Sequence, residues 1–427
     1  MDLRCLIILL KKHKNTIKEN SVIKSLFGTP SGVVFCKSCV ISNQRPSSTV
    51  EFKHDIKEKK KTIGFQDDGV CDACHYHKIK ADNIDWKKRE DQLVATLDKF
   101  RRNDGSHDVV VPGSGGKDSA YTSHVLKYRY GMNPLTVTWA PHLHTNIGWK
   151  NFTNWIHEGG HDNILFTPNG RLHRYLTRLA FINLLHPFQP FIVGQRIIGP
   201  AIAQKYNIQL VMYGENQAEY GNSPDENYIP TMDYKFFSTL DPLKMKLGGS
   251  SIRQIRDETK FNLNDFAPYI PPAAAELESA GVQVHYLGYY LPWDPQECYY
   301  YAVENTGFEA NPERTPGTYS KYSSIDDKID MFHYYTTYIK FGIGRATYDA
   351  SQEIRNGKIT RDEGVHLVEK YDHEFPAKFF DDFLEYIGIS EADFHQTVDK
   401  FRSPHLWKNF NGKWYINHNV AKTGCKD

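Results

Sequence analysis

The sequence has no long hydrophobic run. No stretch of its 427 residues approaches the roughly 18–20 apolar residues that a membrane-spanning helix needs. The only candidate, Cys5–Leu10, is shorter than the apolar part of an export signal, and its lysines follow it instead of preceding it. We therefore expect a cytoplasmic protein with no membrane partner. We interpret residues 1–30 as an N-terminal extension, either a short amphipathic helix or the product of a wrongly chosen start codon.

An excess of charge of either sign is also missing. The 52 lysines and arginines are balanced by 51 aspartates and glutamates, which leaves a formal net charge of +1. Proteins that bind nucleic acids usually concentrate basic residues, so we expect no nucleic-acid partner. A hydrophobic content of 40% and an aromatic content of 13% exclude disorder for most of the chain.

Cysteine is scarce. The seven cysteines lie at positions 5, 36, 39, 71, 74, 298 and 425. An odd number in a reducing compartment argues against a disulfide framework. Cys36-Lys-Ser-Cys39 and Cys71-Asp-Ala-Cys74 form two tight pairs, and four thiolates suit tetrahedral Zn²⁺. Because such a site has no open position for water, we predict a structural zinc module over residues 31–84.

Strand and helix patterns alternate in the next part of the chain. A short buried strand is predicted at Asp108–Val111 and further strands at Leu135–Trp139, Asn163–Thr167 and Ile208–Tyr213, with helical segments between them. This alternation predicts an α/β domain over residues 85–250, with a parallel sheet flanked by helices.

The last part of the chain has a different character. Residues 251–427 are rich in aromatic residues, proline and charge, and helices are expected near 325–345, 361–371 and 376–387. We assign this mostly helical region to substrate or partner binding.

A glycine-rich loop follows the first predicted strand. Glycines allow the backbone to approach a ligand closely, so that successive N–H groups point at phosphate oxygens, and the next helix adds the positive end of its dipole. Lys117 supplies a mobile charge, and Asp118 is compatible with an anion only if a cation such as Mg²⁺ is shared between them. We therefore expect Lys117, Asp118 and Ser119 to be catalytic. The residues expected to bind ATP in this loop are Gly113, Ser114, Gly115, Gly116, Lys117, Asp118 and Ser119. The pattern is not a Walker A loop, because Asp118 follows the lysine.

Two other segments are expected at the same edge of the sheet. In open α/β sheets ligands bind at the carboxyl ends of the strands. Thr138 and Trp139 would then border the adenosine, together with Tyr213 and Gly214 after a later strand. The segment that continues from Gly214 also contains candidates for metal or substrate contact, with surface-loop carboxylates as the alternative. These candidates are Glu215 and Asn216 for substrate and Glu219 for Mg²⁺.

The motifs resemble known families. Ser114–Ser119 resembles the PP-loop of the ATP pyrophosphatases, adenine nucleotide alpha hydrolase-like proteins in which the loop holds the leaving pyrophosphate. From Phe35 onwards the chain resembles the N-acetyl sugar amidotransferases of bacterial surface-polysaccharide synthesis, including lipopolysaccharide O-antigen synthesis. Besides the cysteine pairs and the loop, the likeness rests on Thr167-Pro-Asn-Gly170, Pro187-Phe-Gln-Pro-Phe191, Tyr213-Gly-Glu-Asn216, Trp293-Asp-Pro-Gln-Glu297, Asn311-Pro-Glu-Arg-Thr315, Gly317-Thr-Tyr-Ser-Lys-Tyr322, Lys340-Phe-Gly-Ile-Gly-Arg345 and Ser403-Pro-His-Leu-Trp407.

This resemblance implies a reaction. ATP would adenylate the acetamido oxygen of a nucleotide-linked or nucleotide-activated diacetamido sugar with release of pyrophosphate, and ammonia would then displace AMP to give an acetamidino group. Basic residues could pair with phosphates or a carboxylate of the substrate. The candidates are Arg171, His173, Arg174, Lys321, Lys340 and Arg345.

The resemblance also implies partners. A glutaminase needs a cysteine nucleophile, and no cysteine outside the two pairs has a glutaminase-like context. Cys298 is expected to be a packed core residue. Ammonia is therefore expected from a separate glutaminase with a cyclase-like barrel subunit, similar to the two subunits of imidazole glycerol phosphate synthase.

Two alternatives remain open. One is a PP-loop enzyme that modifies tRNA, such as a thiolase or a lysidine synthetase, and it predicts a basic face. The other is a non-enzymatic adaptor that binds zinc and ATP, which the complete Lys117–Ser119 trio disfavours.

Overall fold

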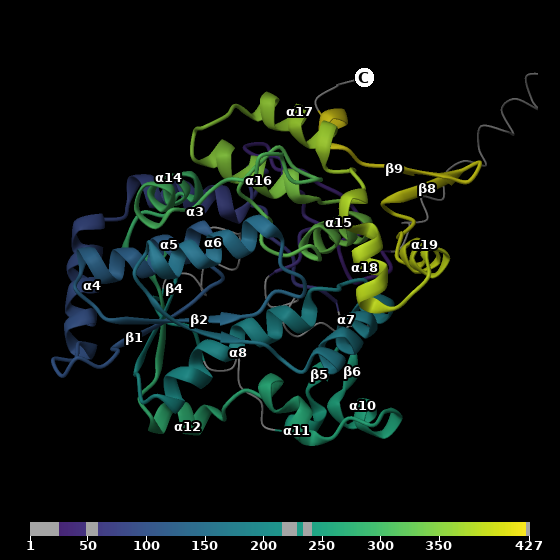
Figure 1. Cartoon of the computed structure of the whole chain (residues 1–427). Coiled ribbons are helices and arrows are strands. Elements are labelled where there is room, and N and C mark those ends of the chain that lie inside the picture. The colour runs from purple at the N-terminus through teal and green to yellow at the C-terminus, as the bar shows by residue number, and fades with distance from the viewer. Residues whose placement is uncertain (1–24, 48–58, 216–228, 234–240, 424–427) are drawn as a thin grey trace, which may run out of the picture.

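A five-stranded sheet forms the centre of the molecule. The computed structural model describes residues 25–47, 59–215, 229–233 and 241–423. All strands are parallel, in the order β3-β2-β1-β4-β7 (Figure 1). The strands are β1 (Val109–Pro112), β2 (Pro134–Trp139), β3 (Asp162–Phe166), β4 (Leu210–Tyr213) and β7 (Gln283–Tyr286). The predicted parallel sheet is therefore confirmed, and so are the four predicted strands.

Helices cover both faces of this sheet. The helices on one face are α4 (Trp86–Phe100), α5 (Lys117–His124), α6 (Asn146–His157) and α14 (Pro295–Thr306), and those on the other are α7 (Gly170–Leu184) and α8 (Gln189–Lys205). Side chains alternate along β1, so that Val109 and Val111 pack with Leu93 and Leu97 of α4, while Val110 belongs to the core under α8. The helix α5 continues into a π-helical turn, Val125–Arg129.

The fifth strand comes from a distant part of the chain. β7 pairs with β4 through Val211 and Val284, and it follows a region of short elements. The sheet thus includes residues of the stretch that we assigned to the C-terminal domain. The short elements in this part of the chain are β5 (Lys246–Leu247), β6 (Ser250–Ser251), α10 (Ile252–Glu258), α11 (Leu263–Phe266), α12 (Ala274–Ser279) and α13 (Leu287–Tyr290).

The C-terminal region is mostly helical, as predicted. Its helices are α15 (Asp330–Phe341), α16 (Arg345–Arg355), α17 (Arg361–Tyr371), α18 (Phe380–Ile387) and α19 (Glu391–Lys400), followed by the hairpin of β8 (Trp407–Phe410) and β9 (Lys413–Ile416). These helices lie beside the carboxyl end of the sheet (Figure 1). Among the described residues, no helix is both long and apolar enough to cross a membrane.

The N-terminal segment packs onto the C-terminal region. Phe27 is buried and stacks on Phe401 with 5.3 Å between ring centroids, and the Leu26 N–H donates to Ser403 Oγ at 3.1 Å. Residues 1–24, with the predicted amphipathic segment, lie outside the described residues. The described end of the expected extension is therefore part of the packed protein. It leads into the cysteine module, in which α3 (Asp72–Asp82) begins directly after Cys71.

Candidate active site

The glycine-rich loop lies at the point where the strand order reverses. From β1 the chain moves to β2 and β3 on one side, and then to β4 and β7 on the other. The segments that follow the adjacent strands β1 and β4 therefore leave the sheet in opposite directions. Open α/β sheets bind ligands at the carboxyl ends of such a pair of strands. They contain Gly113–Gly116 and Glu215, respectively.

The glycines of the loop are required by their surroundings. Gly115 has a φ of +81°, and a Cβ there would lie 2.8 Å from Phe152 Cα. A Cβ at Gly113 would lie 2.1 Å from Ser119 Cβ. No side chain caps the N-terminus of α5 at Gly116. The first-turn N–H groups are therefore available to an anionic ligand.

Lys117 and Asp118 form an ion pair at the start of α5. Lys117 Nζ lies 2.5 Å from Asp118 Oδ2, and both side chains are partly buried. Burial alone lowers the pKa of Lys117, but the Asp118 carboxylate outweighs it and raises that pKa. Burial and then Asp118 raise the pKa of Glu215. A second carboxylate thus lies near the Lys117–Asp118 ion pair, which is a charge arrangement that a cation such as Mg²⁺ fits.

The loop opens into two adjoining cavities. The smaller, of about 170 Å³, is lined by Ser114–Asp118 and by Ser323–Asp326. The larger, of about 350 Å³, extends from Lys117 and Asp118 towards α15 and α16. Residues common to both are Lys117, Asp118, Tyr322, Ser323 and Arg345, so the two cavities form one continuous site.

Arg345 is fixed at the boundary between these cavities. Its Nε lies 3.0 Å from Asp349 Oδ1, one turn further along α16, and its guanidinium lies 4.5 Å from the centroid of the Tyr334 ring. Burial lowers the pKa of Arg345, and Asp349 more than compensates, so the pKa is raised. Thr318 Oγ1 donates to Asp349 Oδ2 at 2.6 Å. The network holds a permanent positive charge near the loop.

Asp330 is a second carboxylate in the larger cavity. It is half-buried at the start of α15, and burial raises its pKa to about 7 despite the nearby Arg345. The neighbouring Asp326 lines the smaller cavity, where burial raises its pKa and a hydrogen bond from Ser114 opposes the rise. These carboxylates can accept hydrogen bonds from hydroxyl or amide groups of a ligand.

Residues 316–420 match the family model described as LPS biosynthesis protein WbpG-like, C-terminal domain. This part of the chain is similar to that domain, and we refer to residues 316–420 as the WbpG-like domain. The match confirms the resemblance to surface-polysaccharide proteins for these residues. The WbpG-like domain contributes Tyr322, Asp330 and Arg345 to the site, so it forms one wall of the cavity into which the loop opens.

Several solved structures are similar to the chain, while no curated protein matches its sequence. An NH3-dependent NAD synthetase from Campylobacter jejuni is 17% identical over 30% of this chain and 56% of its own length, with a TM-score of 0.24. An NMN synthetase from Francisella tularensis is 13% identical over 72% of this chain and 98% of its own, with a TM-score of 0.30. An NAD+ synthetase from Burkholderia pseudomallei is 13% identical over 54% of this chain and 95% of its own, with a TM-score of 0.24.

Two of the expected adenosine contacts have buried side chains. Thr138 Oγ1 accepts a hydrogen bond from Asn163 at 3.1 Å, and Trp139 packs against α8, where a Cβ at Gly194 would lie 2.3 Å from its ring. Neither residue lines the two cavities. Gly214 also packs closely, because a Cβ there would lie 2.6 Å from Trp293. Tyr213 is half-buried, and its hydroxyl lies 3.3 Å from the Arg196 carbonyl oxygen on α8.

The structure places the expected substrate contacts, and the expected Mg²⁺ ligand Glu219, in three groups. Glu215 and Arg345 line the larger cavity, whereas Asn216 and Glu219 lie outside the described residues. The others lie elsewhere: Arg171 and Arg174 are exposed on α7, His173 is buried against Tyr269, Lys321 donates to the Pro312 carbonyl, and Lys340 is buried and donates to the Leu184 carbonyl.

Many cavity-lining residues were not anticipated from the sequence, and four charged ones are important for the site. They are Arg45, Asp326, Asp330 and Asp349. The acidic run from Asp326 to Asp330 was the only local signal for two of them, and nothing in the sequence around Arg45 distinguishes it from a surface arginine.

The four paired cysteines lie together, as predicted. Their sulfur atoms are all within 4.8 Å of one another, with Cys36 Sγ 3.9 Å from Cys74 Sγ and Cys39 Sγ 3.8 Å from Cys71 Sγ. A regular tetrahedron with a Zn–S bond of about 2.3 Å places sulfurs about 3.8 Å apart. The cluster therefore could hold a metal ion, and the spacing fits zinc.

Backbone groups also favour thiolates in this cluster. The N–H groups of Ser38, Cys39 and Cys71 point at Cys36 Sγ at 3.3–3.4 Å. The other three thiols lower the pKa of Cys36, while hydrogen bonding to Cys36 raises the pKa of Cys71. Without a cation the four groups cannot all ionise, so a bound metal is the natural counter-charge.

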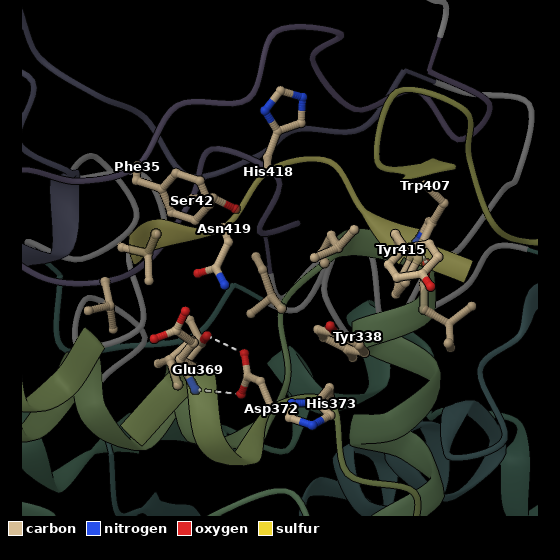
Figure 2. Close-up of a pocket in the computed structure, with 18 of the residues that line it drawn as sticks. Phe35, Ser42, Tyr338, Glu369, Asp372, His373, Trp407, Tyr415, His418 and Asn419 are labelled. Atoms are coloured by element: carbon tan, nitrogen blue, oxygen red, sulfur yellow. Dashed lines mark hydrogen bonds between the residues drawn. The ribbon is translucent and has the colours of Figure 1, made fainter. Parts of the chain in front are cut away.

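A separate cavity of about 400 Å³ lies between the cysteine module and the WbpG-like domain. It shares no lining residue with the two loop cavities. In Figure 2, Trp407 and Tyr415 lie on one side of this cavity and Glu369 on the other. Asp372, with its hydrogen bonds dashed, lies in the lower part of the view. Asp372 accepts from the N–H groups of Gly344 at 3.0 Å and Thr347 at 2.9 Å. It therefore caps α16, whose other side carries Arg345.

Proposed function

We propose that the protein is an AMP-forming, ATP-dependent amidotransferase. It converts an acetamido group of a nucleotide-linked diacetamido sugar into an acetamidino group during polysaccharide synthesis. One observation carries this proposal: Lys117 and Asp118 of the loop share a cavity with Arg345 of the WbpG-like domain. A nucleotide on the loop and an acceptor on that domain would then meet in one site.

The loop suits the first half of the reaction. The acceptor's amide oxygen forms a bond to the α-phosphorus, the bond to the β-phosphate oxygen breaks, and pyrophosphate leaves. First-turn N–H groups of α5 and Lys117 would stabilise the departing charge, which is the kind of preorganised electrostatic effect that contributes most to catalysis. Asp118 and Glu215 would hold Mg²⁺, which supplies further positive charge to the phosphates.

The second half replaces oxygen by nitrogen. Ammonia forms a bond to the activated carbon, the carbon–oxygen bond breaks, and AMP leaves with that oxygen. The product amidinium keeps the amide proton and two of the three protons of ammonia, and the third passes to a carboxylate or to solvent. Asp330 lines the cavity and is suited to accept it.

The larger cavity suits a sugar better than RNA. Its walls combine carboxylates, amides and aromatic rings, which bind hydroxyl groups and the apolar faces of sugars. They include Asp294, Gln296, Asp330, Tyr334, Tyr348, Asp349, Gln352, Glu353 and Asn356. A tRNA-modifying enzyme needs a concentrated excess of basic residues for the phosphate backbone, whereas the 52 basic residues of this chain are balanced by 51 acidic ones.

Ammonia would come from another protein. Among the described residues, Cys298 is the only cysteine outside the metal cluster. It is 2% exposed, and burial raises its pKa well above the usual value, so it is a packed thiol and not a nucleophile. We propose a separate glutaminase subunit and a cyclase-like barrel subunit that delivers the ammonia.

The experiment that tests this function is mass spectrometry of candidate diacetamido nucleotide sugars incubated with protein, ATP, Mg²⁺ and ammonium. The expected product carries NH in place of O, and AMP and pyrophosphate accumulate with it. Formation of ADP and orthophosphate would overturn the proposal. Binding of tRNA with a steep salt dependence would favour the RNA-modifying alternative.

A further inference from the structure

Arg45 is a buried arginine in the wall of the larger cavity. It belongs to the cysteine module, six residues beyond Cys39, and only 6% of its surface is exposed. Its N–H donates to the Ser42 carbonyl at 3.2 Å, and its carbonyl accepts from the Ile63 N–H at 2.9 Å. The backbone at Arg45 is thus fixed on both sides by the module that holds the four thiols.

The charge of Arg45 is not neutralised by the described part of the chain. No described carboxylate forms an ion pair with it, and its buried Nη1 has no hydrogen-bond partner. Its guanidinium carbon lies over the Tyr348 ring, 5.6 Å from the ring centroid. A buried unpaired charge is costly. The guanidinium is therefore available to an anion from outside the described residues.

Neighbouring carboxylates already have other partners. Asp349 pairs with Arg345 and accepts from Thr318. Glu353 accepts from the Tyr319 hydroxyl at 2.7 Å. Both acids line the same cavity as Arg45, yet each is committed to a different group.

Other donors lie beside Arg45. A small cavity of about 20 Å³ adjoins the larger one, and Arg45, Tyr348 and Gln352 line both. Ser351 also borders the small cavity, and its buried hydroxyl has no partner. A guanidinium, an amide and a hydroxyl from two separate elements thus converge on one place, and such a donor set recognises phosphate.

This place differs from the phosphate-binding loop. Arg45 does not line the smaller cavity, which the loop itself surrounds. The phosphates of ATP are accounted for by the amides of the loop and by Lys117. An anion at Arg45 therefore belongs to the second substrate.

We infer that Arg45, with Gln352 and Ser351, binds a phosphate of the acceptor's nucleoside diphosphate. This inference rests on the proposed function, because it assumes a nucleotide-linked acceptor. It also gives the cysteine module a direct part in substrate binding, since the metal site fixes the backbone that presents Arg45. The module would then act as a clamp on the acceptor as well as a structural support.

The test is calorimetric titration of the full-length protein with uridine, guanosine and cytidine diphosphate, after a non-hydrolysable ATP analogue has filled the loop. We expect the wild type to bind one of them, and Arg45→Gln to weaken that binding by at least tenfold. The matched control is Lys37→Gln, because Lys37 is an exposed cation of the same module that lines neither loop cavity. It should bind as the wild type does.

Other outcomes overturn the inference. They are unchanged affinity in Arg45→Gln, equal loss in Lys37→Gln, and absence of binding to the wild type. Preference for simple carboxylates such as acetate over all three diphosphates would also exclude the phosphate. If Arg45→Gln fails to fold, Gln352→Ala replaces a donor on α16 and should weaken binding several-fold.

The binding assay is independent of turnover. Loss of nucleoside diphosphate binding in Arg45→Gln, combined with no turnover of any acetamido sugar by the wild type, would retain the anion site and refute the proposed reaction. Turnover of an acetamido sugar by the wild type, combined with unchanged nucleoside diphosphate binding in Arg45→Gln, would support the proposed reaction and refute the anion site.

Discussion

Lys117 supplies the positive side chain of the loop. Its Nζ lies 2.5 Å from Asp118 Oδ2. We expect Lys117→Ala to lower kcat by about 100-fold or more, because a preorganised charge at the departing pyrophosphate is lost. Pyrophosphate release measures this effect. The melting temperature should change little, since the side chain ends at the cavity.

A surface lysine provides the control for this prediction. Lys150 on α6 pairs with Glu309 at 2.6 Å, and both side chains are about half exposed. Lys150→Ala should keep the wild-type rate. Near-normal pyrophosphate release by Lys117→Ala would contradict the assigned role of the loop.

Asp330 makes stability depend on pH. Burial raises its pKa from 3.8 to about 7, so the folded protein binds this proton more tightly than the unfolded chain does. The contribution of Asp330 to stability is therefore largest below about pH 4 and is lost as the pH rises towards 7. Removing the ionisable group should relieve this loss.

We accordingly expect the melting temperature of Asp330→Asn minus that of the wild type to be larger at pH 8 than at pH 5. Differential scanning calorimetry at the two pH values measures the difference. Asp381, an exposed residue in the first turn of α18, serves as the control, and Asp381→Asn should show no such trend. A constant difference between Asp330→Asn and the wild type would contradict the raised pKa.

At the scale of elements, α16 depends on a cap from another helix. Gly344 provides no side chain for its N-terminus, and Asp372 at the end of α17 accepts the N–H groups of Gly344 and Thr347 instead. Asp372→Ala should cost about 1–3 kcal/mol of unfolding free energy, because buried N–H groups lose their acceptor. Urea denaturation measures this cost.

The same substitution should also lower activity. α16 carries Arg345 and Asp349 into the cavity, so a frayed N-terminus displaces the charge nearest the loop. Asp362→Ala, an exposed change in the first turn of α17, is the comparison and should alter neither stability nor activity appreciably. Equal effects of both substitutions would argue against the cap.

Sequence patterns predicted the regular elements with uneven success. β1 and β2 are runs of buried apolar residues, and they were located to within a residue. β7 was not predicted, because Gln283–Tyr286 contains a histidine and a glutamine and is placed by pairing with β4. The predicted helix over 325–345 begins later, at Asp330, because the loop before it forms the wall of the site.

At the scale of the molecule, the cysteine cluster joins the N-terminal module to the C-terminal helices. The cysteine module packs around Ile343, and Arg361 donates to the carbonyl groups of Cys36 and Cys39. We expect one tightly held zinc per chain, and Cys71→Ser should lose it and lower the melting temperature by several degrees or more. Elemental analysis and calorimetry measure the two effects.

Ser38→Ala is the control for the metal, because it leaves all four thiols in place and its side chain is exposed. It should retain the zinc and the melting temperature. Elemental analysis of the wild type that shows no metal would refute the zinc prediction.

The candidate site was predictable only where it is local. The loop of Gly113–Ser119 has its chemistry in consecutive residues, so its sequence sufficed. The facing wall joins Arg45 to Tyr348, two residues separated by most of the chain, and no periodicity encodes such a contact. Lys321 shows the converse case, because its motif suggested a substrate contact while its side chain donates to the Pro312 carbonyl and lines neither loop cavity.

The cavity's composite wall has a consequence for biosynthesis. A ribosome releases the chain from its N-terminus, so the thiol cluster and the loop emerge long before α16. Until Arg345 and Tyr348 have been translated, a nascent chain cannot form the cavity that we propose for ATP and the acceptor. Nucleotide consumption should therefore begin only when translation is nearly complete, and premature termination upstream of α16 should yield a product without activity.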